Sequence, residues 1–284
     1  NIGNPLLPII EQVEPDDVAV IELSSFQLTM MTQSPQVGVV TNVAPNHLDW
    51  HTDMDEYVEA KKNIVRKNTK RLVVNADCEI TRDFGREIAE SGREVIFFSS
   101  SRANYSEIVG TSYPNAKAVY RRDGVIYISD GKSETTLLPE SEIRLPGVHN
   151  IENYMAAIAM VEGLVDDEAI RHVAKNFGGV EHRIELVRVK DGVRYYNDSI
   201  ASSPSRTIAG LKAFPEKVIL IAGGYDKHIP YDDLGPYICR SVKRLYLGGA
   251  TGALIRQAVE AGQCLAVATL HEACAMSLSG FRRK

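Results

Sequence analysis

The sequence has little cysteine and no long apolar run. Its four cysteines, spread over 284 residues, include no Cys-x-x-Cys pair, so neither a zinc knuckle nor a redox dithiol is predicted. We expect them to be reduced and packed in the core. Apolar stretches such as Val218–Ala222 are far shorter than the roughly 18 residues that a membrane-spanning helix needs. These absences favour a cytoplasmic protein with no membrane partner.

An excess of charge of one sign is also missing. The 32 Lys and Arg residues stand against 37 Asp and Glu, for a net charge of −5, and the basic residues are scattered among acids. Nucleic-acid-binding proteins gather basic side chains into a patch or stripe, so we expect no nucleic-acid partner. The composition is that of a globular protein, and the length suffices for two domains of about 100–200 residues each. We expect a monomer.

What the sequence does contain, in its first part, is short β-branched runs that alternate with helical patterns. Helices are expected just after Pro5, over residues 53–68 and over residues 79–91. The predicted buried strands are Val18–Leu23, Val37–Thr41, Arg71–Asn75 and Glu94–Phe98. Strands that alternate with helices predict a parallel α/β sheet.

The pattern then changes twice. Between Tyr105 and Leu145 the apolar period becomes two, with Asp-Gly turn dipeptides at 123–124 and 130–131, which predicts a small antiparallel meander. Two helices are predicted next, and the helical pattern ends at Gly178-Gly179. The rest predicts a hairpin across Asp191-Gly192, a helix entered at Ser203-Pro204 and three more short strands. We therefore predict a second α/β domain, with limits 1–179 and 180–284.

Polar side chains follow the first two predicted strands. Glu22 ends the first strand, and a carboxylate there is placed to hold Mg²⁺, which prefers oxygen ligands. A solvated acid at a strand end is the plainer interpretation. The loop after the second strand is dense in metal-type ligands, among them His47. The next helix carries Lys61 and Lys62, which by default are exposed lysines.

No complete phosphate-binding loop is found in the sequence. Gly131-Lys132-Ser133 matches the end of the Gly-x-x-x-x-Gly-Lys-Ser/Thr pattern, but Ile126 stands where the first glycine is required. Residues 248–252 follow a strand and open a helix, but they do not match Gly-x-Gly-x-x-Gly. A tight turn explains them better.

Three polar clusters remain in the second half of the chain. Asn150 and Asn153 lie one helical turn apart and could both hydrogen-bond a purine or ribose, or serve as a cap and a surface amide. Arg183 could clamp a phosphate, or pair structurally with a neighbouring acid. Asp198 and Lys227 lie in polar turns after strands. Each cluster alone is a weak signal.

Taken in order, these segments resemble the Mur ligase family. Members have a UDP-sugar-binding domain, a central ATPase domain and a Rossmann-like C-terminal domain that brings the amino acid. The resemblance implies that residues 1–179 are an N-terminally truncated central domain and residues 180–284 a C-terminally truncated last domain. It is carried by residues 1–5, 22–28, 42–49, 60–61, 146–153, 182–183, 197–199 and 223–227.

The resemblance implies ATP and Mg²⁺ as cofactors and amide formation through an acyl phosphate. Residues 22–28, Glu-Leu-Ser-Ser-Phe-Gln-Leu, look most like the member that adds D-glutamate to UDP-N-acetylmuramoyl-L-alanine in peptidoglycan synthesis. Glu22, His47 and Lys61 are the implied metal ligands, with Lys61 carbamylated. Lys61, His47 and Lys227 are the implied catalytic residues. The implied nucleotide-binding residues are Asn150, Asn153, Arg183 and Asp198, and the implied substrate-binding residues are Ser24, Ser25, Gln27 and Ser202.

Two departures from the family pattern leave alternatives open. The family's phosphate loop is not in this sequence, so we expect the chain alone not to turn over ATP. Ile200 stands where many relatives carry Lys, which affects the charge available for D-glutamate. The alternatives are another amide ligase of the same superfamily, such as a folylpolyglutamate synthase, and a non-catalytic nucleotide-binding fragment.

Overall fold

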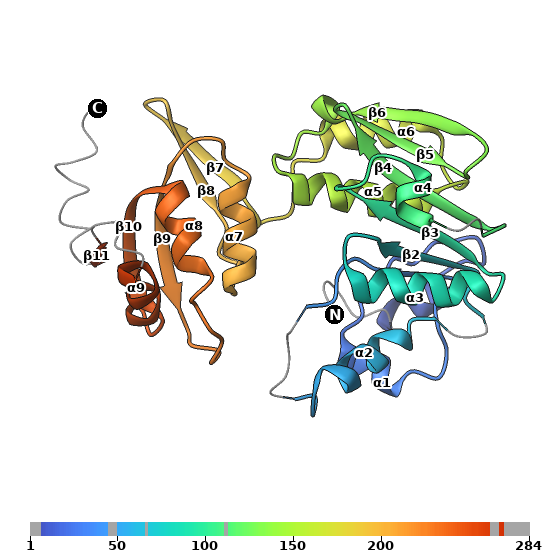
Figure 1. Ribbon diagram of the computed structural model, residues 1–284, viewed down its shortest axis with the longest axis horizontal. Helices are drawn as coiled ribbons and strands as arrows, with labels where there is room; N and C mark the ends of the chain where they lie inside the picture. The colour runs from blue at the N-terminus through green and yellow to red at the C-terminus, as the bar shows by residue number, and fades with distance from the viewer. Residues whose placement is uncertain (1–6, 45–49, 66–67, 111–112, 262–266, 270–284) are drawn as a thin grey trace. The chain divides into compact units, whose positions relative to one another are not determined.

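The structure is a computed structural model that describes residues 7–44, 50–65, 68–110, 113–261 and 267–269 (Figure 1). Contacts divide the chain into two compact units. The first comprises Asn1–Glu140 and Glu152–Ile170, and the second comprises Ser141–Ile151 and Arg171–Lys284. The domain boundary that the sequence predicts after residue 179 stays a prediction.

The first unit is built on a six-stranded sheet in the order β1-β2-β3-β4-β5-β6. Neighbouring strands from β1 to β4 run parallel, and β4, β5 and β6 pair antiparallel. The predicted parallel core and meander are therefore confirmed, as one continuous sheet. The strands are β1 Val37–Val40, β2 Arg71–Asn75, β3 Glu94–Ser99, β4 Ala116–Arg122, β5 Val125–Ser129 and β6 Glu134–Pro139.

The central strands are apolar throughout because both faces of the sheet are covered. Leu72 and Phe97 belong to a core cluster with Phe84 of α3. The alternate side chains Val73 and Ile96 are also completely buried. Such continuous apolar runs are typical of parallel strands. The helices between the N-terminus and residue 176 are η1 Leu7–Gln12, α1 Ser25–Met30, α2 Met54–Lys62, α3 Glu79–Glu90, α4 Tyr105–Val109, η2 Glu140–Glu142, α5 Val148–Val161 and α6 Asp167–Asn176.

One strand prediction is wrong. Residues 18–23 form no strand, and Val18 and Val20 are 76% and 79% exposed. A β-branched run becomes a strand only where a neighbouring strand can take its backbone hydrogen bonds, and in the described residues β1 pairs only with β2. The helix expected over residues 53–68 is also shorter and ends at Lys62, with Asn63 as its C-cap.

The second unit contains the antiparallel hairpin of β7 (Glu185–Lys190) and β8 (Val193–Asn197), and a parallel sheet in the order β11-β10-β9. The predicted hairpin, strands and entry into α7 are confirmed. A core cluster that includes Leu211, Ile238 and Leu245 joins helices to this sheet. The remaining elements are α7 Pro204–Lys212, β9 Val218–Gly224, α8 Leu234–Ser241, β10 Val242–Gly249, α9 Gly252–Ala261 and β11 Val267–Thr269.

Two further expectations concern cysteines and membranes. Cys78 is a free thiol, but Cys239 is disulfide-bonded, so the expectation that all four cysteines are reduced is wrong for Cys239. Within the described ranges, no helix combines the length and the apolar character that crossing a membrane requires.

Candidate active site

Three of the predicted substrate-binding residues form the start of α1. Ser24 is the N-cap: its hydroxyl accepts the Gln27 N–H at 3.3 Å, and the Gln27 side chain accepts the Ser24 N–H at 2.9 Å. This reciprocal pair is a capping box, which satisfies backbone donors that the first helical turn leaves unpaired. Ser25, the next residue, is 3% exposed. The structure therefore gives Ser24 and Gln27 a local capping role.

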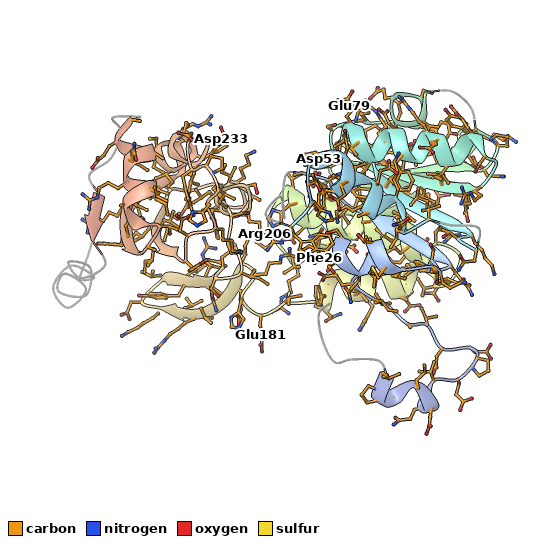
Figure 2. All side chains as sticks on the ribbon, turned by 90° about the horizontal axis from the view of Figure 1, so that it is seen from below. Phe26, Asp53, Glu79, Glu181, Arg206 and Asp233 are labelled. Atoms are coloured by element: carbon orange, nitrogen blue, oxygen red, sulfur yellow. The ribbon has the colours of Figure 1, made fainter. Side chains whose placement is uncertain are left out.

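A buried histidine joins α1 to the segment before α2. His51 is 2% exposed, and its Nε2 lies 2.9 Å from the Ser25 hydroxyl. Its Nδ1 lies 3.7 Å from a carboxylate oxygen of Glu56. The imidazole ring also stacks on Phe26, with 5.7 Å between ring centroids, and contacts Trp50 at 4.6 Å. Figure 2 labels Phe26 of α1 and Asp53, the N-cap of α2.

The two adjacent lysines of α2 have opposite surroundings. Lys62 lies 3.0 Å from Glu59 and 3.7 Å from Glu87, and the hydrogen bond to Glu59 raises the pKa of its ammonium. Burial lowers the pKa of Lys61, although the nearby Glu22 carboxylate opposes the shift. Removing water disfavours the charged form of an amine. The Lys61 ammonium is therefore easier to deprotonate than an exposed lysine, and the Lys62 ammonium is harder to deprotonate.

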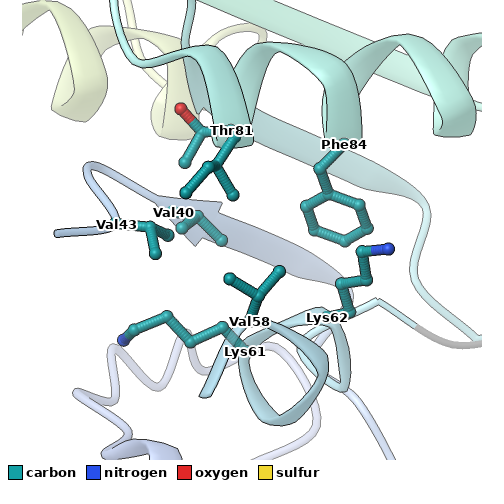
Figure 3. A pocket seen from close by; sticks show the side chains of 8 residues that line it. Val40, Val43, Val58, Lys61, Lys62, Thr81 and Phe84 are labelled. Carbon is teal, nitrogen blue, oxygen red and sulfur yellow. The ribbon is translucent and has the colours of Figure 1, made fainter. Parts of the chain in front are cut away.

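The side chains of the two lysines leave α2 in different directions (Figure 3). Both line a small pocket between α2, β1 and α3, whose other lining residues include Val40, Val58 and Phe84. The Lys61 ammonium lies 5.0 Å from the centroid of the Tyr57 ring. Consecutive helical residues point about 100° apart, so the two lysines, which are both partly buried, meet different surroundings, and only Lys62 reaches Glu59 and Glu87.

The predicted metal ligands are only partly described. Glu22 lies just before the N-cap of α1, outside any strand, and acts electrostatically on Lys61. The structure therefore brings these two predicted ligands together. His47 lies outside the described residues. In the described part of the chain, no group of three or more His, Cys, Asp or Glu is arranged to hold a metal. A Glu22 carboxylate with an anionic Lys61 carbamate would supply the oxygen donors that Mg²⁺ prefers.

In the second unit, Arg183 lies on a strained turn. The residues on either side of it, His182 and Ile184, have φ values of 66° and 45°. A left-handed conformation is a true outlier for a β-branched residue such as Ile184. Asp198 accepts the Ile184 N–H through Oδ1 at 3.1 Å, and Glu185 accepts the His182 N–H at 2.8 Å.

Asp198 and Arg183, both predicted to bind nucleotide, are close enough to interact electrostatically. Burial raises the pKa of the Asp198 carboxyl group, and the Ile184 N–H, His149, Arg183 and Arg206 oppose that shift. A partly buried carboxylate with several basic neighbours can order those neighbours as well as meet a ligand.

The remaining predicted residues are placed as follows. Lys227 donates a hydrogen bond of 2.9 Å from Nζ to the Ser202 hydroxyl, so these two predicted residues meet directly. Asn150 is buried, and its amide donates to the Pro146 carbonyl at 2.7 Å. Asn153 lies one turn further along α5 and is exposed. The hydrogen bond of Asn150 ties the first turn of α5 to the residues just before it.

Sequence reasoning included His51 in the loop of metal-type ligands and missed its buried contact with Ser25. The Ser-Ser-Phe-Gln segment carries the capping-box pattern, which could have predicted α1. No comparable sequence signal marks a histidine that is buried by aromatic residues.

The fold is the one shared by Mur ligases and folylpolyglutamate synthases. MurF from Acinetobacter baumannii matches with a TM-score of 0.64 at 16% identity, covering 89% of this chain and 55% of that chain. A Mycobacterium tuberculosis folylpolyglutamate synthase, solved with ADP and AMPPCP, matches with a TM-score of 0.59 at 15% identity, covering 86% of this chain and 57% of that one.

Sequence comparison places the chain more narrowly. Residues 8–161 match the Mur ligase middle domain, and the chain belongs to the Mur ligase family. It is 53% identical over 259 residues to UDP-N-acetylmuramoylalanine–D-glutamate ligase of Acetivibrio thermocellus, covering 90% of this chain and 53% of that protein. The Ruminiclostridium cellulolyticum enzyme of the same name is 48% identical, over 91% of this chain and 53% of its own length. The chain thus spans about half the length of the curated relatives it matches.

Proposed function

We propose that this sequence forms the central region and part of the C-terminal region of an ATP-dependent ligase that adds D-glutamate to UDP-N-acetylmuramoyl-L-alanine. Two relatives with this name are 53% and 48% identical over about nine-tenths of the chain. The structural observation that carries the proposal is the contrast on α2, where Lys61 is partly buried beside Glu22 and Lys62 is ion-paired. We place the enzyme in the cytoplasm, as a monomer, on the expectations from its sequence.

In the proposed reaction, the alanyl carboxylate of the substrate attacks the γ-phosphorus of ATP, which releases ADP and forms an acyl phosphate. The neutral amine of D-glutamate then attacks the acyl carbon. The tetrahedral intermediate collapses with loss of phosphate, and the amine nitrogen gives up a proton as the amide forms. Cations must neutralise the phosphoryl oxygens in such transition states. Bound Mg²⁺ supplies part of that charge.

Lys61 is proposed to act as a carbamate. The ammonium first loses one proton, and the neutral amine then adds to CO₂ and releases a second proton. The two steps together convert a cation into an anionic oxygen ligand. The low pKa that burial gives Lys61 favours the neutral amine that this step requires. Glu22, His47 and the Lys61 carbamate would then hold Mg²⁺. The Glu22 carboxylate and the carbamate would supply the oxygen donors that Mg²⁺ prefers.

Residues of the second unit are proposed to bind the nucleotide and the amino acid. Arg183 presents a planar guanidinium that suits a bidentate phosphate contact. Lys227 and Ser202, which are hydrogen-bonded to each other, would meet the incoming D-glutamate. Asn150, Asn153 and Asp198 complete the proposed nucleotide-binding set. The polar groups of Ser24, Ser25 and Gln27 are engaged in hydrogen bonds within the protein. We therefore propose that these residues act on the substrate indirectly, by fixing the position of the first turn of α1.

The proposal is tested by assaying a full-length enzyme that contains this sequence for phosphate release. We expect release to require ATP, Mg²⁺, UDP-N-acetylmuramoyl-L-alanine and D-glutamate together. L-alanine or L-lysine in place of D-glutamate serves as the matched control. Turnover with a reduced folate and L-glutamate instead would show a folylpolyglutamate synthase, and no turnover with any of these substrates would contradict the ligase proposal.

A further inference from the structure

The turn that carries Arg183 is held in a conformation that its own residues disfavour. Left-handed backbone at non-glycine residues is strained and persists only where the surroundings enforce it. Here two such residues, His182 and Ile184, flank Arg183. Ile184 is also only 8% exposed, so its side chain is held in the core while its backbone is strained.

Hydrogen bonds from outside the turn enforce this conformation. The Asp198 carboxylate accepts the Ile184 N–H at 3.1 Å. The Asn197 amide and the His182 ring meet at 2.8 Å, and the Ile200 N–H donates to the His182 carbonyl at 3.3 Å. The last residue of β8 and the residues just after it therefore hold both ends of the turn. Among these groups, the Asp198 carboxylate is the one that fixes the backbone of Ile184.

Asp198 can take this position because α7 has no side chain at residue 210. A Cβ atom placed on Gly210 would lie 2.7 Å from the Asp198 Oδ2 atom, well inside contact distance. Glycine at position 210, inside α7, has a lower helix propensity than alanine and so destabilises the helix. The close approach of the Asp198 carboxylate explains why glycine fits this position better than a residue with a Cβ atom.

We propose that Gly210 and Asp198 are positioning residues for Arg183. The open space at Gly210 admits the Asp198 carboxylate, which holds Ile184 in its left-handed conformation and so fixes the direction of the Arg183 side chain. This rests on the proposed function only in assigning a phosphate contact to Arg183. The proposal gives Asp198 a role through the protein backbone, which is separate from any contact that it makes with nucleotide.

The decisive variant is Gly210→Ala. The added methyl group raises the helix propensity of α7, and it clashes with the Asp198 carboxylate in its present position. In the 284-residue chain, we expect amide hydrogen exchange at Ile184 to become about tenfold faster, with an unchanged or higher melting temperature. In the full-length enzyme, we expect kcat to fall by about 10- to 100-fold, as misplacement of a reacting group does. Gly252→Ala is the control, since its Cβ would meet Leu247 at an ordinary 3.6 Å.

Asp198 variants provide a second measurement by hydrogen exchange. Asp198→Asn keeps an oxygen that can accept the Ile184 N–H, so protection at Ile184 should be retained, whereas Asp198→Ala should lose it. Unchanged protection in both Gly210→Ala and Asp198→Ala would overturn the proposal. Lost protection with normal kcat in Gly210→Ala would overturn the link to Arg183. If Arg183→Ala itself leaves turnover intact, the phosphate role fails, while the exchange results still decide the positioning role.

Discussion

The two regions that carry the candidate site residues are organised by different means. In the first unit, residues 24–62 use helix caps and a buried histidine, and no non-glycine residue described there has a positive φ. In the second unit, residues 182–210 include three non-glycine residues with a positive φ, and two of them, His182 and Ile184, are held by hydrogen bonds to side chains. The first region therefore tunes the chemistry of a side chain through burial. The second sets the direction of a side chain through its backbone.

The largest effect that we predict separates the two lysines of α2. Lys61→Ala in the full-length enzyme should lower kcat by about 1000-fold, because it removes the proposed carbamate ligand of Mg²⁺, and the charge stabilisation that a bound metal supplies amounts to several kcal/mol. Added short carboxylic acids should restore part of the activity. Lys62→Ala is the matched control and should change kcat little, since it removes surface ion pairs. A larger loss in Lys62→Ala would mean that the assignment on α2 is off by one residue.

The second prediction concerns the guanidinium group of Arg183, which lies in the strained turn. Arg183→Lys should reduce kcat by about 100-fold, because lysine cannot reproduce a bidentate guanidinium contact in the transition state. The melting temperature should stay the same. If Arg183 were only a structural partner of Asp198 or Glu185, the lysine variant would keep its rate, so full activity would defeat the phosphate contact.

The third prediction tests how His51 stabilises the first region. Ser25→Ala should lower the free energy of unfolding by about 1–3 kcal/mol, because it leaves the buried Nε2 atom of His51 without its partner. In a His51→Phe background the same change should cost less, since the partner is already gone. Denaturant unfolding of the four variants measures the coupling. Costs that simply add would show that the hydrogen bond contributes nothing.

The smallest effect is a gain in stability when Lys61 is removed. Because burial lowers the folded-state pKa of Lys61 below its ordinary 10.5, the folded chain bears a penalty for the charged amine at low pH. That penalty begins to shrink as the pH rises through the folded-state pKa, and it is gone above the unfolded-state pKa of 10.5. Lys61→Met should therefore be more stable than the unaltered chain near neutral pH, by about 1 kcal/mol, and the difference should shrink at alkaline pH. A difference that grows with pH would have the wrong sign.

Much of the fold could be predicted because its signals are local. The run from Arg71 to Asn75 became β2 with the expected bounds, and the Asp-Gly turns define the meander. Val18–Leu23 failed because strand formation depends on a neighbour that composition cannot supply. A sequence can show that α2 carries two lysines, but which of them is buried depends on how the helix packs.

The site was predictable only as a set of residues. The family resemblance implied that Lys227 and Ser202 both lie near the incoming amino acid, and in the structure their side chains are hydrogen-bonded to each other. The buried contact between His51 and Ser25, by contrast, links residues 26 positions apart and has no sequence pattern. The strain at Ile184 is equally hidden, because isoleucine is among the residues least expected in a left-handed conformation.

The central claim, that burial prepares Lys61 rather than Lys62 for reaction with CO₂, has a direct test that needs no turnover. The 284-residue chain, equilibrated with ¹³C-labelled bicarbonate and Mg²⁺, should give a carbamate carbon resonance in its NMR spectrum. That resonance should vanish in Lys61→Arg and persist in Lys62→Arg. A carbamate signal that survives Lys61→Arg, or one that is lost in Lys62→Arg alone, would contradict the account.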